Sequence, residues 1–438
     1  MSGPGPRKGV QAERAVLVGV FLEPPADPEH PLDEIAGLAE TAGATVVAEL
    51  TQRRDRPDQT TYLGKGKVTE LAGLVAHHGA DVVIFDNDLS PAQTRNLEKA
   101  ISTKVLDRSE VILDIFAARA RTYEARLAVE LAQLEYSLPR LKRLWTHLSR
   151  LKMGIGMRGP GEKQLEVDRR LVEKRIHELR AELAGIHGRR ERQVAARQDH
   201  LTVSLVGYTN AGKSTLLNLL TGATELAEDK LFATLDTRTR RWRLPGWGPV
   251  LLSDTVGFIR DLPHRLIASF KATLEETRQA DLLLHVADAS SALVDSQIAA
   301  VRAVLEELAV ADKDTILVLN KIDALPDRTV RDGLLARYPQ AIAVSARTGA
   351  GIPELLRTTS ACLGRGFRDI DVETDPANGR LIAWLGAHGE VLSRNFTADR
   401  VTIHCRLPAA LLGRIDPAAA TVRPHRDAGA PPLEPAAD

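Results

Sequence analysis

Cysteine is scarce in this chain of 438 residues, which contains Cys362 and Cys405 and no others. Two cysteines cannot build a disulfide framework, and both stand among apolar residues, where a reduced thiol inside a core is expected. No run approaches the ~18 apolar residues of a membrane span, and residues 1–8 lack the apolar segment of a signal peptide. These absences predict a cytoplasmic protein without stable membrane insertion, and peripheral association with a membrane stays open.

Net charge is absent as well, because 58 Lys and Arg balance 58 Asp and Glu. Taken alone, this balance argues against a nucleic-acid partner. The charge is unevenly distributed, however, since Leu138 to His200 holds sixteen Lys or Arg against eight Asp or Glu, a net +8. Apolar residues make up 44% of the chain, enough for buried cores in about three domains. We therefore expect a multidomain globular protein with one basic segment.

The strongest signal is a glycine-rich loop between the apolar run 201–206 and the helical pattern of 215–220. Two glycines separated by four residues let backbone N–H groups point at phosphates, and the N-terminus of the next helix adds to this attraction. The lysine would reach the β- and γ-phosphates, and the following serine would ligate the Mg²⁺ that bridges them. We predict a nucleoside triphosphate site formed by Gly207, Tyr208, Thr209, Asn210, Ala211, Gly212, Lys213, Ser214 and Thr215.

A second motif specifies the base. It follows the apolar run 315–319 and reads Asn320, Lys321, Ile322 and Asp323. The Asp323 carboxylate can accept hydrogen bonds from the ring N–H and the exocyclic amine of guanine, whereas adenine has no such pair of donors. Asn320 is expected to tie the motif to the phosphate loop, and the Lys321 stem to cover one face of the base. A later turn is expected to offer a backbone N–H to the guanine oxygen, from Ser345, Ala346 and Arg347. The predicted substrate is GTP.

Two segments between these motifs are expected to respond to the γ-phosphate. One follows the apolar run 250–252 and reads Asp254, Thr255, Val256 and Gly257. Asp254 would hold Mg²⁺ through water, and the Gly257 amide would contact the γ-phosphate. The other has little apolar periodicity, as a mobile segment should, and reads Phe232, Ala233, Thr234, Leu235 and Asp236. A second hydroxyl ligand for Mg²⁺ is expected from this region, with Thr234, Thr237 and Thr239 as the alternatives.

The residue after Gly257 is Phe258, where many small GTPases place the glutamine that orients the attacking water. A phenyl ring cannot hold water, so intrinsic hydrolysis should be slow and should depend on order or positive charge supplied by a partner or a cation. Asn210 stands where related GTPases use K⁺ for this purpose. A plain loop asparagine is the equally weighted alternative.

These segments resemble the translation-factor-related GTPases, and further motifs resemble one family among them, HflX. The motifs are Tyr62-Leu63-Gly64-Lys65-Gly66-Lys67, Arg158-Gly159-Pro160-Gly161-Glu162-Lys163-Gln164-Leu165-Glu166 with Asp168-Arg169-Arg170, and the segment from Phe232 to Asp236. The resemblance implies a GTPase that binds the large ribosomal subunit and separates stalled ribosomes into subunits. By position it makes Ser214 and Thr234 the metal ligands, and Thr234 joins Lys213, Asp254 and Gly257 as catalytic residues. Lys163 departs from the family's threonine without affecting a nucleotide role.

Residues 113–199 are predicted to form an antiparallel helical hairpin, because apolar residues recur there at spacings of three and four. The two seams are Leu127, Leu131, Leu134, Leu138, Leu141, Trp145 and Leu148, and Val172, Ile176, Leu179, Leu183 and Ile186. The segment 153–161 is rich in glycine and proline and is the expected tip. Pro139 should kink the first helix. The basic surplus favours RNA, with a solvated charged face as the alternative, and the resemblance makes ribosomal RNA the expected partner.

The fold class is α/β: a P-loop GTPase domain (200–366), preceded by a small α/β domain (14–112) and the hairpin, and followed by a small α+β domain (367–415). Residues 1–13 and 416–438 are expected to be disordered tails. In the first domain, Gly64 to Lys67 could form a second phosphate cradle, although a turn that starts a helix is favoured. His388 and His404 lack Cys or carboxylate neighbours at metal-ligand spacing, so no metal site is expected in the last domain.

The sequence thus favours a monomer that uses GTP to present its basic hairpin to the large ribosomal subunit. Two rival functions stay open: a GTP-dependent assembly or signalling factor that captures a partner without splitting ribosomes, and an ATP-driven RNA remodeller that uses the N-terminal domain.

Overall fold

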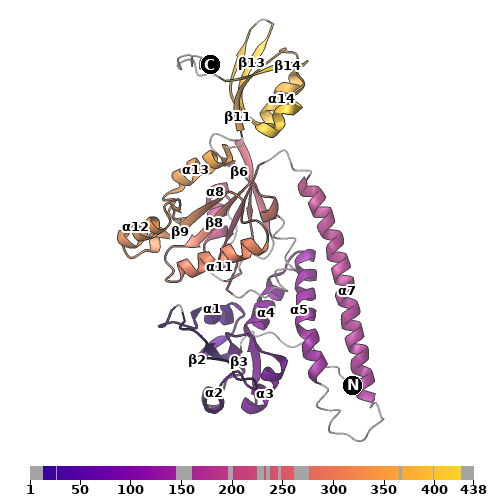
Figure 1. The fold of residues 1–438 in the computed structure, drawn as a ribbon, viewed down its shortest axis with the longest axis vertical. Coiled ribbons are helices and arrows are strands. Elements are labelled where there is room, and N and C mark those ends of the chain that lie inside the picture. The colour runs from indigo at the N-terminus through magenta and orange to yellow at the C-terminus, as the bar shows by residue number, and fades with distance from the viewer. Residues whose placement is uncertain are drawn as a thin grey trace, which may run out of the picture.

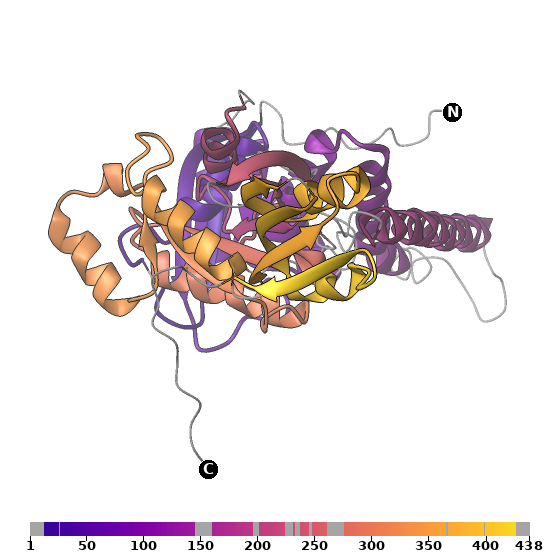
Figure 2. The ribbon, with the colours of Figure 1, turned by 90° about the horizontal axis from the view of Figure 1, so that it is seen from above.

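The computed structural model describes residues 13–25, 27–144, 160–195, 201–223, 231–232, 237–244, 248–260, 276–364, 367–397 and 399–425. Its three sheets follow one another along the long axis of the molecule, and a pair of long helices lies beside them (Figure 1). Seen along that axis, the C-terminal sheet overlies the central one and helix α7 extends to one side (Figure 2). The α/β fold class is confirmed.

The N-terminal sheet is parallel and has the strand order β2-β1-β3-β4. Its elements are β1 (Arg14–Phe21), α1 (Asp33–Thr41), β2 (Thr45–Arg53), α2 (Lys65–His78), β3 (Val82–Phe85), α3 (Pro91–Ile101), β4 (Lys104–Asp107) and α4 (Arg108–Arg119). Successive residues of β1 enter different cores, since Leu17 packs with α1 and α4 and Val18 packs with α2 and α3.

The hairpin consists of α5 (Tyr123–Leu144) and α7 (Pro160–Ala195). The apolar seams pack as predicted within the described residues: Leu127, Ala128, Leu131, Ile176, Leu179 and Leu183 form a buried cluster with Leu134, Leu138, Val172 and Ile186 at its edge. Helix α7 begins at Pro160, so the last two residues of the expected tip are helical, because proline is favoured at the first position of a helix. The rest of the tip, including Arg158, lies outside the described residues.

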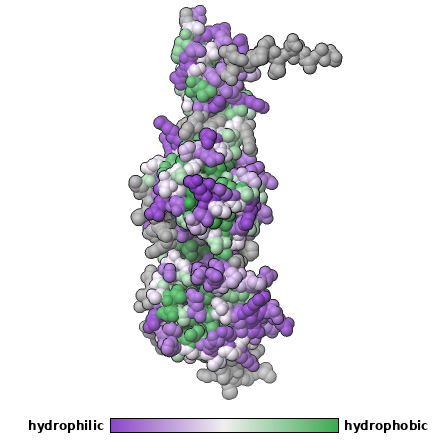
Figure 3. Space-filling view, turned by 90° about the vertical axis from the view of Figure 1, so that its left-hand side faces the viewer, coloured by the Kyte–Doolittle hydropathy of each residue, from purple (hydrophilic) through white to green (hydrophobic). Residues whose placement is uncertain are grey.

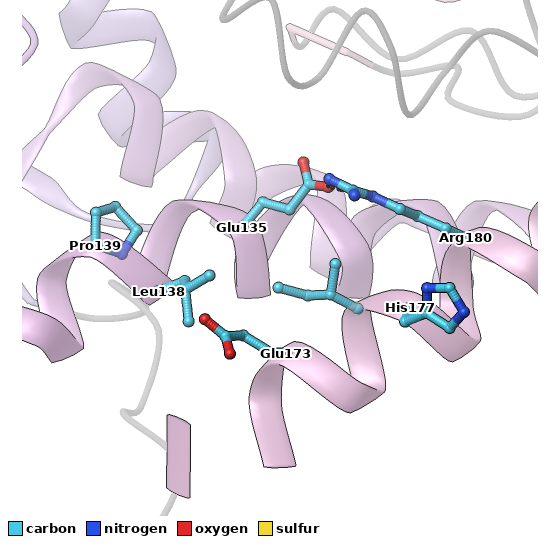
Figure 4. Close-up of a pocket in the computed structure, with 7 residues that line it drawn as sticks. Glu135, Leu138, Pro139, Glu173, His177 and Arg180 are labelled. Atoms are coloured by element: carbon cyan, nitrogen blue, oxygen red, sulfur yellow. Dashed lines mark hydrogen bonds and ion pairs between the residues drawn. The ribbon is translucent and has the colours of Figure 1, made fainter. Parts of the chain in front are cut away.

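A pocket lies in the groove between α5 and α7 (Figure 4), and its lining combines charged and apolar residues. The lining residues are Glu135, Leu138, Pro139, Glu173, Ile176, His177 and Arg180. Arg180 donates to Glu135 at 2.6 Å, and Arg175 pairs with Glu130 at 2.8 Å in the same groove. These bridges hold the two helices together outside their apolar seam.

The central sheet has the order β10-β9-β8-β5-β7-β6 and is parallel except for β6, which runs antiparallel to β7. Its elements are β5 (Thr202–Gly207), α8 (Lys213–Thr221), β6 (Arg238–Leu244), β7 (Gly248–Asp254), β8 (Leu282–Asp288), α11 (Val294–Glu307), β9 (Thr315–Asn320), η1 (Ile322–Ala324), α12 (Arg328–Arg337), β10 (Ile342–Ala343) and α13 (Ile352–Gly364). The carboxyl ends of β5, β7 and β9 lie along one edge, where open α/β sheets bind ligands.

The C-terminal sheet is antiparallel, with the order β12-β13-β11-β14. Its elements are β11 (Phe367–Thr374), α14 (Gly379–His388), β12 (Glu390–Phe396), β13 (Val401–Pro408), η2 (Ala409–Arg414) and β14 (Ala420–Pro424). Strand β14 corrects the expected disorder from residue 416, because residues 420–424 pair with β11 despite their Ala- and Pro-rich flanks. Residues 426–438 lie outside the described residues.

On the face drawn in Figure 3 the surface of the protein is mainly hydrophilic, with smaller apolar areas between the hydrophilic side chains. Among the described helices, none has both the length and the apolar run that crossing a bilayer requires.

Candidate nucleotide-binding site

The predicted phosphate loop joins the end of β5 to the start of α8. A side chain at Gly207 would place its Cβ 2.1 Å from the Val286 carbonyl oxygen, and one at Gly212 would come 2.3 Å from Asn320 Nδ2. Gly212 also has φ +88°, a region that favours glycine. Both glycines are therefore required by close packing, which supports the strand-loop-helix interpretation over an ordinary turn.

Lys213 is the first residue of α8 and folds back over the loop. Its Nζ donates to the carbonyl oxygens of Gly207 at 3.0 Å and Tyr208 at 2.7 Å. Burial of the ammonium lowers the pKa of Lys213 to about 8, and the negative charge of Asp254 only partly opposes this. A buried cation held by two carbonyls at this point is suited to phosphate oxygens, which would restore its ordinary pKa.

This shift predicts that guanine-nucleotide affinity falls as pH rises. Lys213 is charged below its pKa of about 8 and neutral above it, whereas bound phosphates favour the charged form. Between pH 7.0 and 8.5 the GDP affinity should fall about fourfold, since a growing fraction of the protein must take up a proton to bind. Fluorescence titration at fixed Mg²⁺ would measure this, over a range that leaves guanine itself neutral. A flat profile would contradict the shifted lysine.

Two of the residues predicted to hold Mg²⁺, Ser214 and Asp254, lie together in the structure. Ser214 Oγ donates to Asp254 Oδ2 at 2.6 Å, and Asp254 is fully buried. A hydroxyl and a carboxylate are the oxygen donors that Mg²⁺ prefers, so the pair fits the ion. Thr234, the other proposed ligand, lies outside the described residues with Ala233, Leu235 and Asp236. Thr239, one of the alternatives, donates to Glu276 at 3.0 Å and lies within β6.

The base motif is bonded to the phosphate loop. Asn320 is 1% exposed, and its Nδ2 donates to the Ala211 carbonyl oxygen at 2.9 Å, which confirms the predicted tie. Its Oδ1 accepts from the Ala346 N–H at 2.9 Å. That bond occupies one of the backbone donors in the turn that the sequence assigned to the guanine oxygen, so the turn at 345–347 also braces Asn320.

Asp323 lies in η1 with its carboxylate at the surface, next to a buried serine. Ser345 Oγ donates to Asp323 Oδ1 at 2.6 Å, which fixes the carboxylate while leaving its other oxygen for a ligand. Lys321 has φ +63°, and its Nζ pairs with Asp288 Oδ2 at 2.7 Å. Ile322 is half-buried and Arg347 is exposed. The second Asp323 oxygen remains available for the hydrogen bonds from guanine that the sequence predicts.

The segment after β7 lies directly on the phosphate loop. A Cβ at Gly257 would meet Thr209 Cγ2 at 2.8 Å and Lys213 Nζ at 3.1 Å, so no side chain fits there. The Thr255 hydroxyl donates to the Leu205 carbonyl oxygen at 2.7 Å, and Val256 is buried in the core. At Thr255, Val256 and Gly257, therefore, only the backbone can contact a nucleotide.

Phe258 is held against the phosphate loop and cannot orient water. Its N–H donates to the Gly207 carbonyl oxygen at 3.1 Å, and its own carbonyl accepts from the Thr209 N–H at 2.7 Å. The side chain is 2% exposed and packs in the core that the first two sheets share. The position at which many small GTPases carry a water-orienting glutamine thus holds a buried ring that cannot do this work.

A network of charged side chains from the N-terminal domain contacts two segments of the nucleotide site: the phosphate loop at Tyr208 and the segment after β7 at Arg260. The Tyr208 hydroxyl donates to Glu34 at 2.9 Å and accepts from the Arg260 N–H at 2.7 Å. Arg108 donates to Asp86, to Glu34 and, at 3.0 Å, to the Arg260 carbonyl oxygen. Burial and the nearby Glu34 charge raise the pKa of Tyr208, so its hydroxyl stays protonated. The side chain of Tyr208 therefore serves the domain interface and not the nucleotide.

Phe232, the first residue of the upstream switch segment, is also anchored on the N-terminal domain. Phe232 has φ +55° and is 1% exposed, and its ring meets that of Phe116 edge-on with centroids 4.6 Å apart. The neighbouring Leu231 lies against Gly37 of α1. The expectation of a mobile segment does not hold for Phe232, because its aromatic ring is part of the interdomain core. A sequence pattern of low periodicity could not reveal this contact.

The segment from Gly64 to Lys67, which could have formed a second phosphate cradle, is the start of a helix in the structure. Helix α2 begins at Lys65, the Gly64 N–H donates to Gln52 at 2.9 Å, and Lys67 pairs with Glu70. These contacts support the turn that starts a helix.

Comparison with known proteins agrees with this geometry. Sequence profiles match residues 29–117 ("GTP-binding GTPase N-terminal"), 119–197 ("GTP-binding GTPase Middle Region") and 202–321 ("50S ribosome-binding GTPase"). The chain is 47% identical to GTPase HflX of Magnetococcus marinus over 409 residues, 92% of this chain and 94% of the relative. It is 49% identical to GTPase HflX of Escherichia coli over 372 residues, 84% and 87% of the two chains.

A solved structure of a GTP-binding protein from Sulfolobus solfataricus, in complex with GDP, is also similar. It is 24% identical with a TM-score of 0.42, over 81% of this chain and 99% of that chain.

The phosphate loop and the base motif, bonded together on a mostly parallel sheet, define a P-loop GTPase that hydrolyses GTP to GDP and phosphate. High identity over most of both chains identifies the group within this class. The chain belongs to the HflX family of GTPases.

Proposed function

We propose that this GTPase binds the large ribosomal subunit through its basic hairpin and, in the GTP state, separates stalled or idle ribosomes into subunits in the cytoplasm. The observation that carries the proposal is the hairpin itself. Its helices pack on each other along one apolar seam, and the segment from 138 to 200 has a net charge of +8. Such a charge favours contact with RNA phosphates. The match of residues 202–321 to the 50S ribosome-binding profile supports the same partner.

The proposed hydrolysis is an in-line attack of water on the γ-phosphate. The Lys213 ammonium and the loop amides would stabilise the charge that develops on the phosphate oxygens. Ser214, Asp254 and Thr234 would hold Mg²⁺, which supplies further positive charge when bound. Because Phe258 is buried and apolar, the ribosome has to complete the site, and Asn210, which is exposed with φ +61°, is the candidate for K⁺-dependent help.

The interface between the N-terminal and GTPase domains would couple nucleotide binding to the position of the hairpin. Segments that would respond to the γ-phosphate lie against α1 and α4, and α4 leads directly into α5. A shift in the position of Arg260 or Phe232 would therefore reach the hairpin through α4. We propose that GTP binding sets the angle of the hairpin through this interface.

Splitting is tested by mixing the protein and a non-hydrolysable GTP analogue with intact ribosomes and sedimenting them. The proposal expects free subunits with the analogue and intact ribosomes with GDP. Co-migration with intact ribosomes would instead support a factor that captures its partner without splitting it. GTP hydrolysis with and without large subunits, in K⁺ and in Na⁺, should show stimulation by the subunit. No stimulation in either salt would overturn the ribosome-activated mechanism.

A further inference from the structure

The C-terminal sheet has one core face and one polar face. Alternate residues of β11 and β13, such as Val372 and Ile403, are buried in the core with α14. Their neighbours point to the opposite face, where Asp371 stands directly across from His404. The end of β14 reaches the same place, because the His425 N–H donates to the Asp369 carbonyl oxygen at 2.9 Å. Three strands thus bring two histidines and two aspartates together.

The side chains of this cluster converge closely. His425 Nδ1 lies 2.9 Å and 3.0 Å from the two carboxylate oxygens of Asp371. The rings of His404 and His425 are nearly parallel, at 12°, with centroids 3.4 Å apart. One potential ligand atom each from Asp371, His404 and His425 lies within 4.8 Å of the others. Their side chains are 30%, 17% and 24% exposed, so a small ion can reach them from solvent.

We propose that Asp371, His404 and His425 form a binding site for a first-row divalent cation of the Zn²⁺ type. Two imidazoles and one carboxylate suit zinc, whereas Mg²⁺ and Ca²⁺ take oxygen ligands. An imidazole binds a cation in the plane of its ring, so the two parallel rings have to turn about their side-chain torsions on binding.

Asp369 is placed to support one of the ligands. Its Oδ1 lies 2.5 Å from His404 Nε2, which leaves the other ring nitrogen of His404 for the cation. A carboxylate behind a metal-bound histidine fixes the ring and raises its basicity. The ion pairs beside the cluster are balanced in number: Arg406 pairs with Asp369 and Glu390, and Arg400 and Arg423 both pair with Glu373, so three arginines face three carboxylates. A bound cation would thus meet the carboxylate charge of Asp371 without an uncompensated arginine beside it.

The site also has a structural consequence. His425 follows the last residue of β14, whereas Asp371 and His404 lie within the two neighbouring strands. A cation bound by all three would fasten the end of β14 to β11 and β13, so binding to the folded domain would stabilise it. Sequence spacing did not reveal the cluster, because its ligands come from three separate strands.

Zinc titration of the full-length protein by isothermal calorimetry tests this site, with saturating GDP and Mg²⁺ present to occupy the nucleotide site. We expect one zinc ion per chain. His404→Ala and His425→Ala should each weaken zinc binding about 100-fold or more, and Asp369→Asn about 10- to 100-fold. His388→Ala is the matched control, because His388 stacks on Trp384 in α14, away from the cluster, and should leave the zinc affinity unchanged.

Thermal unfolding gives an independent readout. Zinc should raise the unfolding midpoint of the wild type and of His388→Ala but not of His425→Ala, whose substitution near the end of the last strand leaves the core untouched. Circular dichroism without zinc would establish that each variant is folded. Absence of a one-to-one zinc complex, or an unchanged zinc affinity in the His404→Ala/His425→Ala double variant, would overturn the proposal.

Discussion

Asp323→Asn should convert this GTPase into a protein that prefers xanthine nucleotides. The asparagine presents one acceptor and one donor, so its amide would oppose the exocyclic amine of guanine. Xanthine has an oxygen in place of that amine and would pair with the new donor. Affinity for GDP should fall about 10³-fold or more, as expected where a site built to hydrogen-bond its substrate loses that pairing, and affinity for XDP should rise. Competition of GDP and XDP against a fluorescent nucleotide would measure both.

The substitution should leave the local fold intact. The Ser345 hydroxyl, which donates to Asp323 Oδ1 at 2.6 Å, can donate to the asparagine oxygen in the same way. Asp327→Asn is the matched control, because Asp327 caps α12 by accepting from the Val330 N–H and asparagine caps equally well. An undiminished affinity of Asp323→Asn for GDP would show that Asp323 does not contact the base.

Arg108→Ala should lower the free energy of unfolding by about 3–5 kcal/mol, the usual cost of removing one partner from a buried charge network. The Arg108 side chain is 3% exposed and stands between Asp86 and Glu34. Without it, Asp86 would keep only Arg260 and Glu34 only the Tyr208 hydroxyl among the described residues, and the Arg260 carbonyl would lose its donor at 3.0 Å. Urea unfolding followed by circular dichroism would measure the change.

Lys67→Ala provides the comparison for this prediction. Lys67 also forms an ion pair in the N-terminal domain, with Glu70 at 2.9 Å, but these side chains are 31% and 49% exposed, whereas Arg108 is 3% exposed. Such exposed pairs contribute about 0–1 kcal/mol. A loss below about 1 kcal/mol for Arg108→Ala would mean that the network does not hold the two domains together.

The parts of this site that depend on local spacing were predictable from sequence. Gly207, Gly212 and Lys213 belong to one loop and the start of the helix after it, and Asn320 and Asp323 lie at and just after the end of a strand. Their residue types and spacing are set by the phosphate and base chemistry. The helical seam between α5 and α7 was also predictable, because its period is local.

Contacts between distant segments were not predictable in this way. Glu34, Asp86, Arg108 and Arg260 look like ordinary surface charges in the sequence, and nothing in their spacing shows that they meet. Phe232 and Phe116 likewise meet only because two sheets pack together. The strand β14 was missed for a related reason, since its partner β11 lies about fifty residues earlier.

The core shared by the first two sheets limits how the chain can be divided. Tyr208, Phe232, Phe258 and Ile259 are buried against residues of α1, α4 and the N-terminal sheet. A fragment that began near residue 200 would present these four side chains to water as one apolar patch beside the phosphate loop. Such a patch promotes self-association. The catalytic unit of this protein therefore includes the N-terminal domain. An isolated GTPase fragment would lack the packing partners of these four side chains, so its activity would not represent that of the whole protein.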